Sequence, residues 1–195
     1  RHICSFDAFM EDRSRGFVGR EFVFKQLDSF LNSPDRTSGY FVIQGEPGIG
    51  KSAILSQVVQ RYECDVHHFN IAAQGINTPR SFLANTGARI IRQFGLPYRE
   101  LPPDFDTGGA FLATLLQQSS AKLGGQQRLI IAIDALDEVA TTPDVSQANV
   151  LFLPVSLPKG IFVVATTRNA HDVRLDVTDC ESPCLDPGSI ENTRD

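Results

Sequence analysis

The segment that most constrains the fold of this chain is residues 45–52, with the sequence GEPGIGKS. A short apolar run at residues 40–43 precedes it. An amphipathic pattern follows it, and its apolar face is formed by Ile54, Leu55, Val58, Val59 and Tyr62. The pattern predicts a buried strand, a tight glycine turn and a helix in direct succession. Such a turn directs successive backbone N–H groups inward, and the helix N-terminus adds its positive dipole end, so the segment predicts an anion-binding site.

These residues match the phosphate-loop signature G-x-x-x-x-G-K-[ST], whose fixed positions each have a physical task. The side chain of Lys51 can reach the β- and γ-phosphates of a nucleotide, and the Ser52 hydroxyl can ligate Mg²⁺. We therefore expect a nucleotide with Mg²⁺ as the ligand. The nucleotide-binding residues predicted from the loop are Gly45, Glu46, Pro47, Gly48, Ile49, Gly50, Lys51 and Ser52. The alternative is a glycine-rich turn followed by a solvated lysine.

A second polar cluster follows the apolar run at residues 129–133, which ends in Asp134. Because the carboxyl ends of parallel strands share one edge of a sheet, we expect Asp134 to face Ser52 and to hold Mg²⁺. A second carboxylate near it can orient or deprotonate the attacking water. Glu138 is the first candidate for this base and Asp137 the second. The alternative is that both acids cap a helix or lie in solvent.

Arg168 follows another apolar run, at residues 161–166. We expect this arginine to emerge on the same sheet edge as Asp134, where a guanidinium can distinguish ATP from ADP by contacting the γ-phosphate. The alternative is an arginine paired with a surface acid. The predicted catalytic residues are thus Glu138, Asp137, Lys51 and Arg168.

Strand-like and helix-like segments alternate along the rest of the chain. Strands are predicted at 66–71 and at the apolar runs named above, and helices at 20–31, from Thr78-Pro79 onward and over 111–123, with a loop at 96–107. This alternation predicts an α/β fold with a parallel sheet covered on both faces. His67 and His68 fall on a predicted strand, where the period of two expects one side chain to point inward and one outward.

Composition excludes several classes of protein. The hydrophobic fraction of 42% supports a folded core, and four cysteines are too few for a disulfide scaffold. Cys180 and Cys184 form a single pair without a matching partner pair, so free thiols are favoured over a zinc site. Residues 1–170 hold equal numbers of acids and bases, and the net charge of −5 arises after residue 170. We therefore expect no direct nucleic-acid binding, and no apolar run is long enough to span a membrane.

Three motifs in this order resemble the STAND class of P-loop ATPases, the relatives of AAA+ proteins that include the NACHT and NB-ARC families. Residues 17–21 (FVGRE) are similar to the family's hGRE segment, residues 133–138 (IDALDE) to the NACHT acidic motif, and residues 165–168 (ATTR) to the sensor-one strand. The resemblance implies that Val18 and Arg20 lie against adenine and that Arg168 lies near the γ-phosphate. It also implies a five-stranded parallel sheet in which the sensor strand lies between the phosphate-loop strand and the Asp134 strand.

The resemblance further implies a switch held closed by ADP and opened by ATP, with slow hydrolysis. It implies flanking effector and repeat-built sensor domains, homo-oligomers on activation and a cytoplasmic location. We expect a lead-in at residues 1–13, the nucleotide-binding domain at 14–182, and a last strand leading into a helical domain at 183–195. The chain starts at Arg1 and stops in mid-pattern at Asp195, so a piece of a longer protein is expected.

Three other functions are compatible with the same loop. One is a P-loop kinase for a small molecule, although the loop at 95–106 carries Arg99 as its one arginine, where such kinases usually carry several in a lid. Another is an interaction module in which nucleotide is only structural. The last is a DNA-replication ATPase of the AAA+ class.

Overall fold

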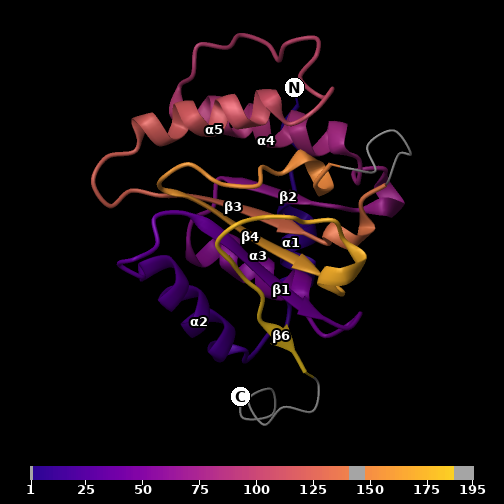
Figure 1. Ribbon diagram of the computed structural model, residues 1–195. Helices are drawn as coiled ribbons and strands as arrows, with labels where there is room; N and C mark the ends of the chain where they lie inside the picture. The colour runs from indigo at the N-terminus through magenta and orange to yellow at the C-terminus, as the bar shows by residue number, and fades with distance from the viewer. Residues whose placement is uncertain (1, 141–147, 187–195) are drawn as a thin grey trace.

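The computed structural model describes residues 2–140 and 148–186, which form a parallel sheet between two layers of helices (Figure 1). The helices are α1 (Asp7–Ser14), α2 (Glu21–Asn32), α3 (Lys51–Arg61), α4 (Pro79–Phe94) and α5 (Ala110–Lys122). The strands are β1 (Gly39–Gly45), β2 (Val66–Phe69), β3 (Leu129–Asp134), β4 (Ile161–Thr167), β5 (Cys180–Glu181) and β6 (Cys184–Leu185). The predicted α/β class and the predicted loop at 96–107 are confirmed.

The strand order is β2-β3-β4-β1-β5, and all of these neighbouring strands pair in parallel. β4 lies between β1 and β3, so the predicted position of the sensor strand is confirmed. The last strand is split in two, because β5 pairs with Tyr40 and Phe41 whereas β6 pairs with Gln44 and Gly45. This order brings the carboxyl ends of β1, β3 and β4 together at one edge of the sheet.

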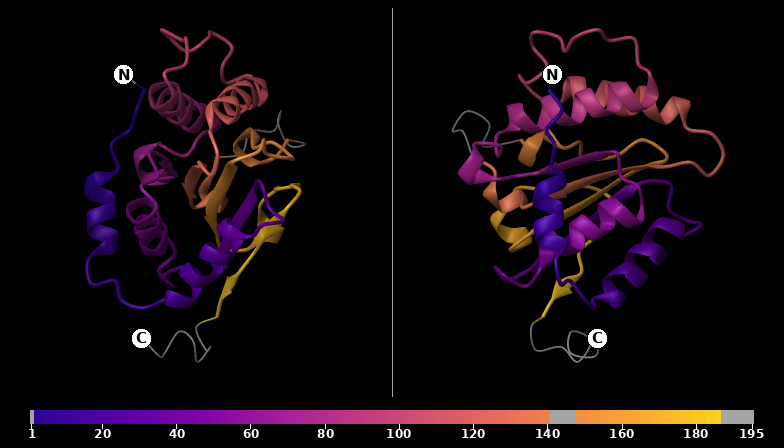
Figure 2. Two further views of the ribbon diagram at one scale, coloured as in Figure 1. Left: turned by 90° about the vertical axis from the view of Figure 1, so that its left-hand side faces the viewer. Right: turned by 180° about the vertical axis from the view of Figure 1, so that it is seen from behind.

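The two faces of the sheet bury two separate hydrophobic clusters. Along β1, Tyr40 and Val42 face the α4 and α5 layer, and Phe41 and Ile43 face the layer of α1, α2 and α3. The side view in Figure 2 shows α4 and α5 on one side of the sheet and the other three helices opposite. Because both faces are covered, the strands are apolar at nearly every position, as a central parallel strand requires.

The N-terminal segment differs from the lead-in expected at residues 1–13. Helix α1 crosses that boundary and packs against α3. Phe6 and Met10 belong to the core, with exposed fractions of 2% and 7%. The sequence around α1 is polar on average and has no clear apolar period, which is why the pattern did not predict a helix there.

The prediction for the histidines of β2 is wrong, because both His67 and His68 are buried. β2 is an edge strand, yet Phe6 packs edge-on against both imidazole rings, and Phe82 of α4 contacts His68 from the other side. Burial lowers the pKa of both groups, that of His68 to about 4. The N-terminal segment therefore covers a sheet edge that would otherwise be open for pairing.

No helix in residues 2–140 and 148–186 is long and apolar enough to cross a membrane. The predicted start of a helical domain falls mostly on residues 187–195, which lie outside the described residues. β6 ends immediately before them, so the predicted last strand at 183–195 is represented by Cys184–Leu185.

Candidate nucleotide-binding site

The phosphate loop joins the end of β1 to the start of α3 by two glycines in the left-handed region. Gly48 has φ +81°, and Gly50, the residue before α3, has φ +99°. Side chains rarely adopt these angles, which accounts for glycine at both positions. Gly45 is required for a different reason, since a Cβ there would lie 3.0 Å from side-chain atoms of Ile49 and Leu185.

Lys51 folds back over the loop that precedes it. Its Nζ donates to the carbonyl oxygens of Gly45, at 2.5 Å, and of Glu46, at 2.9 Å. Partial burial lowers the pKa of Lys51, and the nearby carboxylates of Asp137 and Asp134 oppose this effect. The ammonium is thus held at the mouth of the loop by neutral acceptors, which an anionic ligand can replace.

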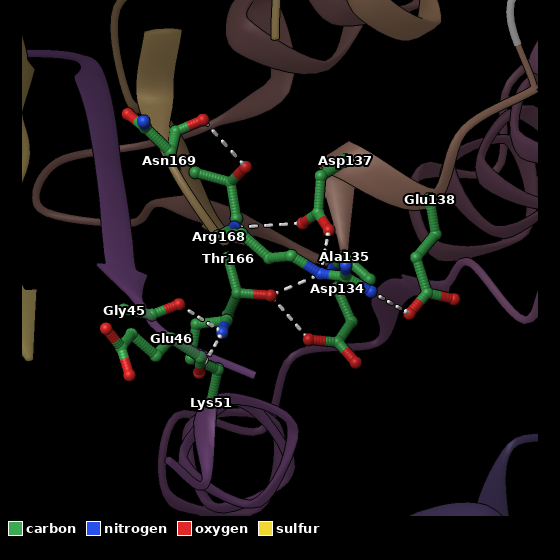
Figure 3. A network of polar contacts seen from close by, with 11 residues as sticks. Gly45, Glu46, Lys51, Asp134, Ala135, Asp137, Glu138, Thr166, Arg168 and Asn169 are labelled. Carbon is green, nitrogen blue, oxygen red and sulfur yellow. Dashed lines mark hydrogen bonds and ion pairs between the residues drawn. The ribbon is translucent and has the colours of Figure 1, made fainter. Parts of the chain in front are cut away.

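Asp134, at the end of β3, is a nearly buried carboxylate with an exposed fraction of 3%. Its Oδ1 accepts a hydrogen bond of 2.5 Å from the Thr166 hydroxyl of β4, and that same hydroxyl accepts from the backbone N–H of Ala135 (Figure 3). Burial raises the pKa of Asp134, while the hydroxyls of Ser52 and Thr166 favour its charged form. A desolvated carboxylate beside a lysine and a serine hydroxyl is the arrangement that a divalent cation stabilises.

The two acids that follow Asp134 have different surroundings. Asp137 accepts from Arg168 twice, from Nε at 2.8 Å and from the backbone N–H at 2.9 Å, and its side chain is 10% exposed. Glu138 lies 3.9 Å from the Arg168 guanidinium, and its side chain is 38% exposed. Figure 3 shows the arginine reaching between the two carboxylates. Both residues lie in the short 3₁₀ helix η2 (Leu136–Glu138).

Two asparagines from the connection between β2 and α4 brace this acidic segment. Asn70 Nδ2 donates to the carbonyl oxygen of Asp134 at 2.7 Å, and Asn77 Nδ2 donates to the carbonyl oxygen of Glu138 at 2.7 Å. These bonds hold the backbone of the acidic segment without using its carboxylates. The carboxylates therefore stay available to the cavity that they line.

A cavity of about 310 Å³ lies where the three strand ends meet. Its lining contains Lys51, Ser52, Asp134, Asp137, Glu138 and Arg168, together with Pro47, Gly48 and Gly50. The structure thus brings together all the predicted catalytic and metal-binding residues. Of the loop positions, Gly45, Glu46 and Ile49 are outside the lining.

The two residues expected against adenine do not line this cavity. Val18 is 78% exposed, and Arg20 donates from Nη2 to the Ile49 carbonyl oxygen at 3.3 Å. Arg20 therefore contacts the backbone of the phosphate loop and helps to hold that loop. It does not contribute to the lining of the cavity. Its backbone is left-handed, with φ +67° at the start of α2.

Two polar lining residues, Thr166 and Arg13, were not predicted from the sequence. Thr166 was within the predicted sensor strand, but a threonine in an apolar run is not a distinctive signal. Arg13 comes from α1, and no motif marks it. The free thiols expected from the cysteine pattern are found, and residues 2–140 and 148–186 contain no cluster of three acid, histidine or cysteine ligands for a metal.

Comparison with known families gives a match to the model described as "AAA ATPase domain", over residues 16–154. The match spans more than half of the chain and includes the phosphate loop and the acidic segment. The chain belongs to the AAA ATPase domain family. This AAA domain is therefore a P-loop nucleotide-binding ATPase. No curated protein matches the chain significantly.

One solved structure in particular shares this fold. Cdc6p from Pyrobaculum aerophilum is 16% identical, with a TM-score of 0.51, over 87% of this AAA domain and 48% of that chain. A chain of Drosophila ORC bound to DNA is 14% identical, with a TM-score of 0.49, over 92% of this domain and 46% of that chain. This chain spans about half the length of each. At these identities, the first match shows a shared fold and nothing further.

Proposed function

We propose that this AAA domain is the nucleotide-binding core of a STAND-type signalling ATPase. It binds ADP or ATP with Mg²⁺ and hydrolyses ATP slowly, and the exchange of ADP for ATP drives opening and assembly. The observation that carries the proposal is the cavity at the strand ends. In it a lysine, a buried carboxylate, a more exposed carboxylate and an arginine converge from three separate strands.

The residues around Asp134 suit Mg²⁺. The carboxylate is buried with a raised pKa, and the Ser52 hydroxyl lies beside it, so both supply the oxygen donors that this ion prefers. Ser52 and Asp134 would hold the ion, which when bound neutralises phosphate charge. Thr166 keeps the carboxylate oriented by its hydrogen bond to Oδ1. Lys51 exchanges its loop carbonyls for phosphate oxygens.

The different surroundings of the two acids support Glu138 as the base. Asp137 already accepts from both the backbone N–H and the side chain of Arg168, so its carboxylate oxygens are occupied. Glu138 has only a long contact of 3.9 Å with the same arginine, and its side chain is partly open to solvent. Glu138 is therefore the carboxylate that can orient and deprotonate a water molecule. Asp137 serves as the partner of Arg168.

The Arg168–Asp137 pair supplies a physical basis for sensing the γ-phosphate. The Arg168 side chain is 54% exposed, and an ion pair at such a site contributes about 1 kcal/mol or less. A phosphate carries more charge than a carboxylate and accepts the same bidentate donors, so it can take the guanidinium from Asp137. ADP lacks that phosphate and leaves the pair intact. Arg168 thus links the nucleotide state to the position of η2.

The wider organisation follows from the STAND proposal. The nucleotide-binding domain extends to residue 182 and includes helix α1 and Phe6, which pack in its core, and 183–195 lead towards a helical domain. Effector and sensor domains of the same protein flank this core in the cytoplasm, and copies assemble in the ATP state. The neutral charge balance of residues 1–170 supports a switch that does not bind nucleic acid directly.

Amide hydrogen exchange on the chain tests the switch. We expect the Arg168 amide, which donates to Asp137, to exchange faster with a non-hydrolysable ATP analogue and Mg²⁺ than with ADP. The Ala135 amide, bonded to Thr166, is the internal control and should exchange equally in both states. Hydrolysis should proceed at about 10⁻³–10⁻² per second, as in other switch NTPases. Equal exchange at Arg168 in the two states, phosphoryl transfer to a metabolite, or stimulation by duplex DNA would contradict the proposal.

A further inference from the structure

Arg13 is the one described lining residue of the cavity that comes from outside the strand-end loops and α3. It lies in the last turn of α1, whereas the other lining residues lie at or just after the ends of β1, β3 and β4 or begin α3. The matched family segment begins at residue 16, so neither Arg13 nor its helix is part of the match. Figure 2 shows α1 against α3, the helix that starts with Lys51 and Ser52.

The other charged groups of the cavity already have partners. Lys51 donates to loop carbonyls, Asp134 accepts from Thr166, and Arg168 donates to Asp137. Arg13 differs from them: its Cζ lies 5.1 Å from the centre of the Phe9 ring. Among residues 2–140 and 148–186 no carboxylate pairs with it. A guanidinium that lies over the face of a ring can still direct its N–H groups at an anion.

The charge of the cavity favours a third cation. Three carboxylates line it, from Asp134, Asp137 and Glu138, against the two cations Lys51 and Arg168. Without Arg13 the lining is therefore net negative, which disfavours a polyphosphate in the absence of a metal ion. With Arg13 the formal charges balance before any metal binds.

Aromatic packing fixes the position of Arg13. Phe9, on which its guanidinium stacks, lies 5.2 Å from the ring of Phe69 at the end of β2, and Phe6 lies 5.3 Å from the same ring. Phe6 and Phe69 are fully buried. The stacking partner of Arg13 is thus tied to the sheet, so the arginine is presented on a rigid support.

Hydrogen bonds from α4 anchor the segment that precedes α1. The Cys4 N–H donates to Asn85 Oδ1 at 2.9 Å, and Arg89 Nη2 donates to the Cys4 carbonyl oxygen at 2.6 Å. Asn85 and Arg89 are both buried, and Arg89 Nε donates to Asn85 Oδ1. The chain is therefore held on both sides of Phe6, and α1 is a fixed wall of the site.

We propose that Arg13 is a phosphate-binding residue of this cavity, so that the N-terminal segment at residues 4–14 is part of the nucleotide site. The inference rests on the proposed nucleotide binding and extends it. Arg13 contacts the phosphate tail, and its contribution increases with the number of phosphates.

The test compares Arg13→Met with Arg15→Met in titrations of the chain with ATP, ADP and AMP. Methionine keeps an apolar side chain over Phe9 while it removes the charge. Arg15 is exposed, directly after the end of α1, and lines a separate surface hollow with Asp7 and Gln60, so its variant is the matched control. We expect Arg13→Met to weaken ATP binding by about tenfold, ADP by less and AMP hardly at all. Arg15→Met should bind all three as the wild type does.

A third variant, Lys51→Ala, separates the two hypotheses. If Arg13→Met binds ATP as tightly as Arg15→Met while Lys51→Ala loses binding, the Arg13 proposal is wrong and the nucleotide site stands. If neither the wild type nor any variant binds nucleotide, both are wrong. A loss that is equal for ATP and AMP would also overturn the phosphate contact. Melting temperatures of the two methionine variants should agree within about 2 °C, because both side chains are exposed.

Discussion

The two walls of the cavity are built on different principles. The acidic wall, made by the ends of β3 and β4, consists of side chains that bond to one another: Asp134 with Thr166, and Asp137 with Arg168. The loop wall, between β1 and α3, consists of backbone in left-handed glycine conformations, with Lys51 donating to carbonyls of the loop. The side chains of the acidic wall are therefore paired with one another without a ligand, whereas the backbone of the loop wall is shaped to bind one.

This difference predicts that substitutions in the two walls have different effects. A change in the loop wall removes groups that await phosphate, so it should act on affinity. A change in the acidic wall breaks pairs between side chains, so it should act on turnover, on discrimination between nucleotides or on stability.

Lys51→Ala should weaken ATP binding by about 100-fold or more, because it removes the cation at the mouth of the loop. Isothermal titration would measure it. Lys25→Ala, on the exposed face of α2, serves as the control and should bind as the wild type does. An unchanged affinity in Lys51→Ala would mean that the loop does not hold phosphate.

Glu138→Gln should slow ATP turnover by about 100-fold while ATP affinity stays within about twofold of the wild type. The reason is that the amide keeps the shape of the side chain but cannot take a proton. Single-turnover hydrolysis measures the rate, and Glu100→Gln, in the loop after α4, is the control. Should Asp137→Asn slow turnover more than Glu138→Gln, Asp137 would be the base instead.

Arg168→Met should reduce the preference for ATP over ADP by about tenfold, through weaker ATP binding. ADP binding should change little, because the arginine stays with Asp137 when no γ-phosphate is present. Competition titrations with both nucleotides would measure the ratio, with Arg174→Met as a control outside the cavity lining. If the binding of ATP and of ADP weakened equally, Arg168 would contribute to general nucleotide affinity, as the loop wall does, and would not discriminate between the two nucleotides.

Asp134→Asn should raise the free energy of unfolding of the nucleotide-free domain at pH 7, by about 1 kcal/mol, while it abolishes stabilisation by Mg²⁺ with nucleotide. Burial raises the pKa of Asp134, so the folded wild type loses stability as pH rises from the ordinary aspartate pKa through the raised value. Asp134→Asn has no titrating group at this position and does not lose this stability. The difference in the free energy of unfolding between the variant and the wild type should therefore grow with pH. Urea unfolding at several pH values between 4 and 7 would measure it, and a gap that shrinks as pH rises would contradict the burial argument.

In the same pH series, protonation of His68 changes the stability of the wild type and of Asp134→Asn in the same way. His68 has its pKa lowered to about 4, so the unfolded chain binds a proton at a higher pH than the folded one. Stability therefore falls as pH falls from about 6.5 towards 4, in the wild type and in Asp134→Asn alike. The difference between the two proteins at each pH removes this contribution.

Local pattern was sufficient for much of the fold. The helix that begins at Pro79 has a capping box at Thr78 and Ser81, and the apolar runs at β3 and β4 need no distant partner to be recognised. The same holds for Gly48 and Gly50, whose spacing from Lys51 marks the phosphate loop. Such features depend on residues within one turn or one strand, and the sequence lists those neighbours directly.

Contacts between distant residues could not be predicted in this way. Thr166 lies 32 residues from Asp134, and Arg168 lies 31 from Asp137, so each pair meets only when β4 aligns beside β3. The burial of both β2 histidines likewise depends on Phe6 covering the sheet edge. No periodicity or motif links these partners, so the sequence pattern could not predict their contacts.

Short-range patterns were enough to predict the alternating strands and helices between residues 20 and 166, the phosphate loop and the acids at and after the end of β3, although not helix α1. The tertiary structure decided which acid Arg168 engages, which carboxylate is buried and that α1 delivers Arg13 to the cavity. The physical reason is the same in each case. Parallel strands bring their carboxyl ends together from far apart in the chain, and only the assembled sheet specifies which side chains become neighbours.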